Sequence, residues 1–316
     1  MIVSGYSMDL LRNIHGYKYA DMLTDGEKEM LRDYMVDGIA KLELPLRYIP
    51  SYKNAMDEVD YMKENFLLSM DVTVGKDPAI LYATDPPITF MLNDMDHMLI
   101  SMSTDTGDVE ALYERVKKIS DQLEEIFPFQ RDRTFQYLSS SIPLCGNGLV
   151  IDSMVHIPAL MSQNKVVNAA QKTMKYTGGM LLPFNQVSRP NAFFIVRVIS
   201  KGNIAEDIRF AKNMVEELTV MEEAEVTSLR ENPDFLSFLK EHIRDYQIKD
   251  RVYFPDFLRT LDDVSLAGKV GILPFRYDKM KEILVRTQPE HLKRLAIHAE
   301  DVPAFYKQSI ETYMEN

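Results

Sequence analysis

The chain has 316 residues, of which 46 % are apolar and 27 % are charged, so it can bury the core of one large domain or two modest ones. Its formal net charge of −12 argues against nonspecific binding to nucleic acid or anionic membranes, because both select clustered Lys and Arg. The single cysteine excludes an internal disulfide, and no uncharged run approaches the roughly 20 residues of a membrane span, so we expect a cytoplasmic protein.

The first part of the chain predicts two helices with a strand between them. Residues 24–41 carry apolar side chains at helical spacing, with Asp25 as the expected N-cap. Residues 88–103 alternate in type, which predicts a strand with a bend at residues 93–97. Between residues 107 and 127, apolar residues recur every three or four positions and predict the clearest helix of the chain.

The second part predicts three more strands and a long helix. Residues 139–160 read as a strand, an irregular turn at 143–148 and a second strand, and residues 193–199 read as a central strand. Residues 203–230 predict one long helix, which Pro233 ends.

The remaining chain predicts short helices, punctuated by Pro255, Gly268, Gly271, Pro274 and Pro289. Pro289 suits the first turn of a helix. We therefore predict a first domain over residues 1–230 and a small helical domain over residues 231–316.

Two blocks of sequence are similar to motifs of a known enzyme family. The first is Asn93-Asp94-Met95-Asp96-His97, and the second runs from Tyr137-Leu138-Ser139-Ser140-Ser141 to His156-Ile157-Pro158-Ala159-Leu160. They resemble motifs of the ATP:guanido phosphotransferases, most closely the bacterial protein-arginine kinases, which carry Asn-Glu-Glu-Asp-His, Tyr-Leu-Thr-Ser-Cys-Pro and a strand ending near His-Leu-Pro-Ala-Leu. The spacing holds without gaps. Weaker matches extend the resemblance over most of the chain.

This resemblance implies a fold and a chemistry. The fold is α+β: a guanido-kinase catalytic domain, glutamine-synthetase-like, with an antiparallel sheet flanked by helices, followed by a small helical C-terminal domain. The implied chemistry is phosphate transfer from ATP with Mg²⁺ to an arginine or guanidino group. Such transfer rests on positioning and charge neutralisation, for which bidentate arginine forks are well suited.

Most of the family's phosphate-binding arginines are replaced in this chain. By the resemblance, the replaced positions are Ser7, Asp9, Leu99 and Val150, whereas Arg12 keeps an arginine. An Asp about 4 Å from a phosphate charge costs roughly 4 kcal/mol at an effective dielectric constant of about 20. A shifted alignment near the N-terminus would put another basic residue in place of Ser7 and Asp9. The candidate cofactor-binding residues are Arg12, His97 and Arg189, and no residue is a candidate metal ligand.

The residues that position and deprotonate the guanidinium also differ. Asp94 stands for the first glutamate of the family block and is one methylene shorter, and Met95 stands for the second. The loop with the family's third glutamate falls within residues 153–205, which contain no Asp or Glu. The family cysteine falls on Ser141, which cannot form a thiolate. Asp94 and Ser141 are therefore the candidate catalytic positions, both altered.

The acid-free segment also has two interpretations. Its cations are either solvated or paired elsewhere, or they form a residual anion-binding face. These cations are Lys165, Lys172, Lys175, Arg189, Arg197 and Lys201.

Three functions fit these residues. The first is a non-catalytic relative of protein-arginine kinase that acts through protein contacts, as a homodimer or with an active paralogue, a kinase activator or Clp-type protease machinery. The second is an active ATP-dependent kinase with an altered site. The third is a binding module for another anion that uses the basic segment and residues 139–141. The joint replacement of arginines and carboxylates favours the first.

Overall fold

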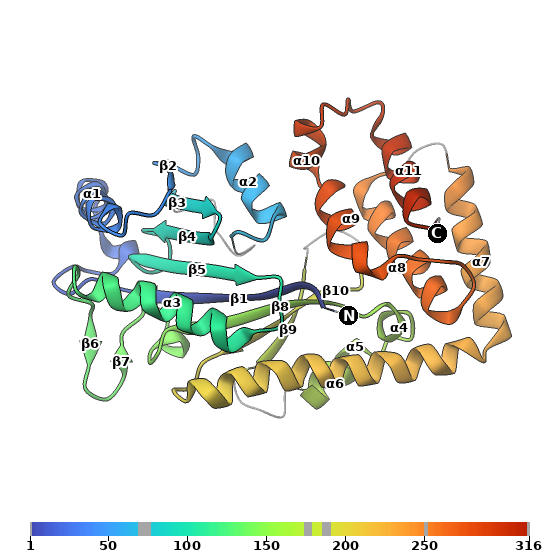
Figure 1. Ribbon diagram of the computed structural model, residues 1–316, viewed down its shortest axis with the longest axis horizontal. Coiled ribbons are helices and arrows are strands. Elements are labelled where there is room, and N and C mark those ends of the chain that lie inside the picture. Colours follow the sequence, from blue (N-terminus) through green and yellow to red (C-terminus); the bar gives the residue numbers. More distant parts are fainter. Residues whose placement is uncertain (1, 69–76, 174–178, 185–190, 250–251, 315–316) are drawn as a thin grey trace. The chain divides into compact units, whose positions relative to one another are not determined.

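The computed structural model describes residues 2–68, 77–173, 179–184, 191–249 and 252–314. The chain divides into two compact units. Unit 1 comprises Met1–Ser4, Met154–Val196 and Lys212–Asn316, and unit 2 comprises Gly5–Ser153 and Arg197–Ala211. The predicted boundary at residue 230 falls between α6 (Ile204–Arg230) and α7 (Pro233–Ile248), labelled in Figure 1, and stays a prediction.

The largest sheet has eight strands in the order β2-β3-β4-β5-β1-β8-β10-β9. Pairing is antiparallel between β1 and β5, β2 and β3, β3 and β4, and β4 and β5. The predicted α+β class, with an antiparallel sheet flanked by helices, is confirmed. The strands are β1 (Ile2–Arg12), β2 (Arg47–Ile49), β3 (Ala79–Thr84), β4 (Pro87–Leu92), β5 (Met98–Thr104), β8 (Leu149–His156), β9 (Gly179–Pro183) and β10 (Phe193–Ile199).

Within unit 2, β4 and β5 form a hairpin whose turn is the Asn93–His97 block. Leu92 pairs with Met98 in the register, and the backbone N–H of Asn93 donates to the His97 carbonyl at 2.9 Å. Asn93 takes a φ of +60°, a left-handed conformation that asparagine tolerates better than most residues. The predicted single bent strand over residues 88–103 is therefore wrong in detail, because the bend is a complete chain reversal.

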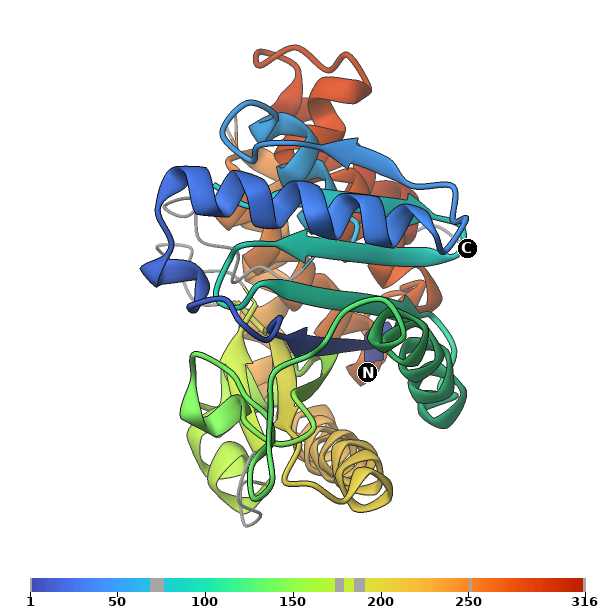
Figure 2. The ribbon, with the colours of Figure 1, turned by 90° about the vertical axis from the view of Figure 1, so that its left-hand side faces the viewer.

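In unit 2, helix α1 (Asp25–Ala40) packs against the ring of Phe127, which follows helix α3 (Val109–Glu124) in the chain. A Cβ on Gly38 would lie 2.1 Å from that ring, so only glycine permits this approach of α1. The Tyr34 ring also packs edge-on against Phe127, with centroids 5.1 Å apart. Figure 2 shows α1, in blue, in front of the teal strands of unit 2. The buried residues of α3 follow the predicted period and include Val109, Leu112, Val116 and Leu123.

A third helix of unit 2, α2 (Met56–Glu64), covers a separate part of the core. Val59 and Met62 of α2 are buried with residues of β2, β3 and β4, and Leu99 of β5 packs against this cluster. Leu99 thus has an apolar packing role. The short strands β6 (Arg131–Asp132) and β7 (Gln136–Tyr137) pair with each other in a second sheet.

The N-cap of α1 is Thr24, so the prediction of Asp25 is wrong. Thr24 Oγ1 accepts from the backbone N–H of Glu27 at 3.3 Å, and the Glu27 carboxylate accepts from the backbone N–H of Thr24 at 2.8 Å. This reciprocal capping box satisfies two donors that the first turn otherwise leaves open. Asp25 is the first helical residue.

The Thr24→Ala variant is expected to lose about 1 kcal/mol of unfolding free energy, because the cap acceptor is removed. Asp25→Ala is the matched control, with an expected loss of about 0.3 kcal/mol from the helix dipole alone. Urea unfolding of both variants measures the difference. An equal loss in the two variants would contradict the assignment of the cap.

Unit 1 contains most of the helical C-terminal region, in agreement with the prediction. Proline occupies the first turn of α7, α8 (Phe254–Val270) and α10 (Pro289–Arg294), and Gly271 ends α8 in a left-handed conformation. Among the described residues, no helix has both the length and the hydrophobicity of a membrane span. The other helices with residues in this unit are α4 (Pro158–Ser162), α5 (Val166–Thr173), α6, α9 (Met280–Arg286) and α11 (Val302–Met314).

The segment 139–160 differs from its prediction at both ends. Residues 139–141 are not a strand, because Ser139 Oγ and the backbone N–H of Ser140 donate to the buried carboxylate of Asp96. At the other end, Pro158 begins the helix α4 instead of continuing a strand. Only β8 matches the expected second strand.

Candidate functional site

The structure brings the Asn93–His97 block and the serine block together in unit 2, through the buried carboxylate of Asp96. Asp96 Oδ1 accepts from Asn13 Nδ2 and from the backbone N–H of Ser140, both at 2.8 Å. Asp96 Oδ2 accepts from Ser139 Oγ at 2.6 Å. One side chain therefore ties the segment after β1, the hairpin turn and the serine segment together.

His97 is held by hydrogen bonds at both ring nitrogens. Its Nδ1 accepts from the backbone N–H of Ile14 at 2.9 Å, so Nε2 carries the proton and donates to the Lys18 carbonyl at 2.7 Å. Burial lowers the pKa of His97, against smaller raising effects of the Lys18 carbonyl and the Asp96 carboxylate. The geometry gives His97 a structural role.

His97 is expected to titrate below its ordinary pKa of about 6.5 in the folded protein. The unfolded chain then binds more protons, so the contribution of His97 to stability falls as the pH is lowered through the region below about 6.5. A ring NMR titration, with the His97 signal assigned by its loss in His97→Gln, measures this pKa. A midpoint at or above 6.5 would contradict the assignment.

Arg12 is buried, with 4 % of its surface exposed, and its guanidinium is used within the protein. Nε donates to Ser120 Oγ at 3.2 Å, and Nη1 donates to the carbonyls of Leu11 at 2.8 Å and Asn147 at 3.0 Å. The guanidinium also lies 3.7 Å from the centroid of the Tyr137 ring, a cation–π contact. Burial lowers the pKa of Arg12 to about 10.

Three of the positions that the resemblance assigns to family arginines lie on one face of the paired strands β1 and β5. Ser7 pairs with Ser103, Asp9 with Ser101 and Leu11 with Leu99, and residues opposite each other in a register point to the same side. Asp9 is buried on this face, and Leu99 packs against the α2 cluster. The fourth position, Val150 in β8, is also buried.

The two candidate catalytic positions are in unit 2. Arg189, a candidate cofactor-binding residue, lies outside the described residues. Asp94 is buried in the hairpin turn, and Ser141 is half-buried. The backbone N–H of Ser141 donates to Ser139 Oγ at 3.1 Å. Cys145, which the sequence did not single out for this site, places its Sγ 3.9 Å from the Ser141 carbonyl. A thiol therefore lies beside Ser141, the position that the resemblance assigns to the family cysteine, because the short helical turn Ile142–Leu144 reverses the chain between them.

The described residues of unit 2 lack the groups that would hold Mg-ATP. The positions Ser7, Asp9 and Leu99 offer a hydroxyl, a carboxylate and an alkyl group in place of guanidinium forks, and Arg12 is already engaged. Within the described part of the chain, no three His, Cys, Asp or Glu residues gather as a metal site. This donor set does not fit a triphosphate with its metal, and no phosphoryl-transfer step follows from it.

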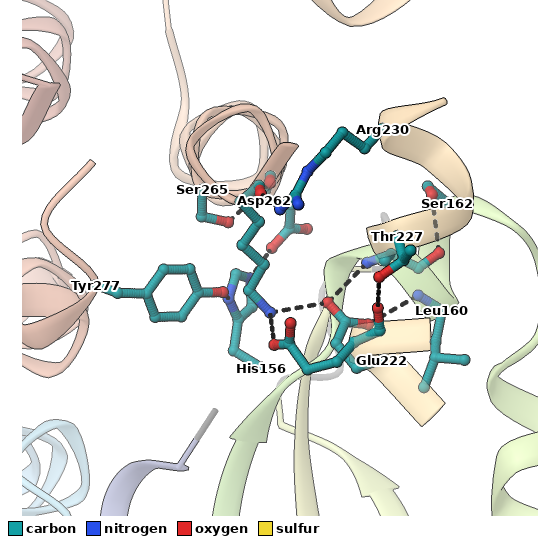
Figure 3. Close-up of polar contacts among 12 residues, drawn as sticks. His156, Leu160, Ser162, Glu222, Thr227, Arg230, Asp262, Ser265 and Tyr277 are labelled. Carbon is teal, nitrogen blue, oxygen red and sulfur yellow. Dashed lines mark hydrogen bonds and ion pairs between the residues drawn. The ribbon is translucent and has the colours of Figure 1, made fainter. Parts of the chain in front are cut away.

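Unit 1 contains a second buried polar cluster, shown in Figure 3. His156 Nδ1 lies 2.8 Å from the Tyr277 hydroxyl, and His156 Nε2 lies 2.8 Å from Asp262 Oδ1. Asp262 Oδ2 accepts from the backbone N–H of Ala192 at 3.0 Å. Burial lowers the pKa of His156 and raises the pKa of Asp262 and Tyr277. The cluster fastens the end of β8 to the C-terminal helices.

The second half of this cluster is a buried ion pair between Glu222 of α6 and Lys269 of α8, 3.1 Å apart. Glu222 also accepts from the backbone N–H groups of Ala159 at 3.0 Å and Leu160 at 2.9 Å, in the first turn of α4. Sequence reasoning missed this cluster apart from noting His156. The sequence signal was the set of polar residues on an otherwise apolar face of α8.

The cations of the acid-free segment include two that are paired. Arg197 makes a bidentate pair with Asp152, at 2.9 Å from Nε and 2.7 Å from Nη2, and Lys165 pairs with Glu225 at 2.6 Å. These two cations are therefore paired within the protein, as one of the two interpretations of the segment expects. Lys175 and Arg189 lie outside the described residues.

Comparison with known sequences finds similarity to a known enzyme family. The sequence profile of the ATP:guanido phosphotransferase C-terminal catalytic domain matches residues 30–179. A protein-arginine kinase of Clostridium perfringens is 22 % identical over 311 residues, covering 95 % of this chain and 92 % of its own length. One of Halothermothrix orenii is 25 % identical over 314 residues, covering 93 % of this chain and 86 % of its own length.

Solved structures show the same fold. A duplicated taurocyamine kinase from Schistosoma mansoni, with bound transition-state-analogue components, gives a TM-score of 0.60 at 13 % identity, over 94 % of this chain and 47 % of its own. A lombricine kinase gives a TM-score of 0.58 at 18 % identity, over 71 % of this chain and 66 % of its own. The predicted guanido-kinase fold is confirmed, and the chain is similar to the ATP:guanido phosphotransferases over residues 30–179 and to protein-arginine kinases over nearly its whole length.

Proposed function

We propose that this protein is a non-catalytic relative of protein-arginine kinase that acts through protein contacts. The observation that carries the proposal is the state of Arg12. The arginine that the sequence keeps at a family phosphate position is buried and donates to Ser120 and to two backbone carbonyls. Its release toward a phosphate would leave those acceptors unpaired and would break the contact with Tyr137.

The electrostatics of the β1 and β5 face support the proposal. A carboxylate at Asp9 repels a triphosphate where the family has a cation, and neither Ser7 nor Leu99 supplies a charge. A single arginine is worth about 10³ to 10⁵ in rate in phosphoryl transfer. The replaced arginines together would have stabilised the transition state by more than any one remaining side chain of this face can.

The residues of the hairpin turn fall into two groups: those that match the family block and those that differ from it. Asn93, Asp96 and His97 match the family block, and here each binds the protein itself: Asn93 Nδ2 donates to the Lys28 carbonyl at 3.0 Å, alongside the Asp96 and His97 contacts above. The two differing positions are Asp94 and Met95. The frame of the motif is thus accounted for by folding alone, without a requirement for catalysis.

Exposed apolar side chains next to the serine segment support a protein partner. Ile142 is 85 % exposed and Met95 is 42 % exposed, and Ser140 Oγ donates to the Met95 carbonyl at 2.9 Å. Methionine and isoleucine at this edge suit contact with an apolar protein surface. We propose that the partner is a second copy of the chain, an active paralogue, a kinase activator or Clp-type protease machinery. We place the protein in the cytoplasm.

Phosphoarginine analysis tests the proposal. The purified chain is incubated with Mg-ATP and an arginine-rich protein, and phosphoarginine is measured by mass spectrometry under non-acidic conditions. We expect no phosphoarginine above the no-enzyme background, while the Clostridium perfringens relative serves as positive control. Phosphoarginine formed by this chain would instead establish an active kinase with an altered site.

A further inference from the structure

Unit 1 has a cavity of about 480 Å³ bordered by α4, α7 and α8. Its volume lies within the roughly 300–1,000 Å³ typical of small-molecule sites. The residues from α7 and α8 recur at helical spacing, so each helix presents one side to the cavity. The cavity is separate from the serine segment and from the Asn93–His97 block, which are in unit 2, although Pro158 of the second motif block lines it.

One wall of the cavity carries opposite charges that do not pair with each other. Arg259 and Asp263 are one turn apart on α8, and both line the cavity. Arg259 is exposed and forms no hydrogen bond or ion pair with another described residue. Asp263 Oδ2 lies 3.3 Å from His242 Nδ1, and its other oxygen accepts no hydrogen bond from the described part of the chain. Burial raises the pKa of Asp263 despite the neighbouring His242 and Arg259.

The carboxylate next to Asp263 in the sequence already has hydrogen-bond partners. Asp262 also lines the cavity, but its two oxygens are engaged by His156 and the Ala192 backbone N–H. The wall therefore offers one guanidinium fork and one carboxylate oxygen to a ligand. A ligand with a single charge satisfies only one of these groups and faces the other with the wrong sign.

The rest of the cavity lining is largely apolar and aromatic. Phe235 and Phe238 of α7 both line the cavity, with ring centroids 6.3 Å apart. Phe238 is 49 % exposed and its ring packs against His242, with centroids 4.1 Å apart. Met161 of α4 and Leu266 of α8 extend the apolar lining. An exposed phenylalanine ring at a cavity suits an apolar or aromatic group of a ligand.

We propose that this cavity binds a free α-amino acid with an apolar or aromatic side chain. The ligand carboxylate pairs with the Arg259 fork, its ammonium group with the open oxygen of Asp263, and its side chain packs on Phe235 and Phe238. A guanidinium fork matches a carboxylate in bidentate geometry, and the ammonium group also gains from nearby aromatic faces. Ligand binding here is independent of ATP and of the proposed function.

Isothermal titration calorimetry of the full chain with three related probes tests the charge pattern. L-Phenylalanine carries both charges, phenethylamine lacks the carboxylate, and 3-phenylpropionate lacks the ammonium group. We expect saturable binding of L-phenylalanine, and roughly tenfold or greater weakening for each half-ligand, because each loses a charge-assisted contact. Equal affinity of either half-ligand, or no saturation by L-phenylalanine, L-leucine or L-methionine at millimolar concentration, overturns the proposal.

A pair of arginine variants locates the site. Arg259→Gln is expected to weaken L-phenylalanine binding roughly tenfold or more, since the fork is lost. Arg259→Lys is expected to restore part of the affinity, because the charge returns without the bidentate geometry. Arg244→Gln is the control, since Arg244 is an exposed residue of α7 that does not line the cavity. Equal affinities for Arg259→Gln and the wild-type chain would place the ligand elsewhere and contradict the proposal.

Discussion

Replacement of Glu222 by alanine is expected to lower the free energy of unfolding by about 3 to 5 kcal/mol. Glu222 is fully buried and pairs with Lys269, whose side chain is also largely buried. The substitution removes the closer carboxylate of the Lys269 ammonium group, which keeps the more exposed Glu223 at 3.8 Å, and it leaves the backbone N–H groups of Ala159 and Leu160 without their acceptor. Each of these losses is costly because water does not replace the carboxylate in the interior. Urea unfolding followed by circular dichroism measures the change.

Glu225→Ala is the matched control on the same helix. Glu225 pairs with Lys165 at 2.6 Å, but the lysine side chain is 48 % exposed, so the expected loss is below about 1 kcal/mol. Similar losses for Glu222→Ala and Glu225→Ala would show that the buried pair does not stabilise α4, α6 and α8 as described.

Replacement of Asp96 by alanine is expected to cost about 3 kcal/mol of unfolding free energy. The substitution removes three hydrogen bonds to a charged acceptor, from Asn13, Ser139 and the Ser140 backbone. Hydrogen bonds to charged groups contribute about 1.5 to 3 kcal/mol each, and partial relaxation of the serine segment offsets part of the sum. Denaturant unfolding provides the measurement.

Asp121→Ala is the control for this prediction. Asp121 forms an exposed pair with Lys117 one turn away on α3, and its loss is expected to cost about 0.5 kcal/mol or less. If Asp96→Ala were no more destabilising than this control, Asp96 would not be the residue that holds the two motif blocks together.

Residue patterns predicted much of the fold, because hydrophobic periodicity and the placement of proline and glycine are local features of the sequence. The strand Phe193–Ile199 has the predicted bounds, the helix Ile204–Arg230 begins one residue inside its prediction, and Pro289 begins α10 as expected. The errors arose where a capping side chain or a proline overrides the local pattern. Thr24 replaces Asp25 as the cap because Glu27 completes a capping box, and Pro158 starts a helix where a strand was expected.

The candidate site was predictable only as a set of positions. The family resemblance located Asp94, Arg12, His97 and Ser141, but the sequence does not tell whether an arginine faces a ligand or a neighbouring strand. The contacts of Arg12 with Ser120 and Asn147 join residues more than a hundred positions apart, which no local pattern encodes. The return of Cys145 toward Ser141 likewise depends on the turn between them.

The most direct test of the central claim is the thermal unfolding midpoint with and without Mg-ATP, with MgCl₂ alone as control. A ligand at about 100 times its dissociation constant stabilises a protein by about 2.7 kcal/mol. If Arg12 is structural and the β1 and β5 face lacks phosphate-binding cations, the midpoint at millimolar Mg-ATP equals that with MgCl₂ alone. A clear rise of the midpoint with Mg-ATP would contradict the account and would indicate a working nucleotide site.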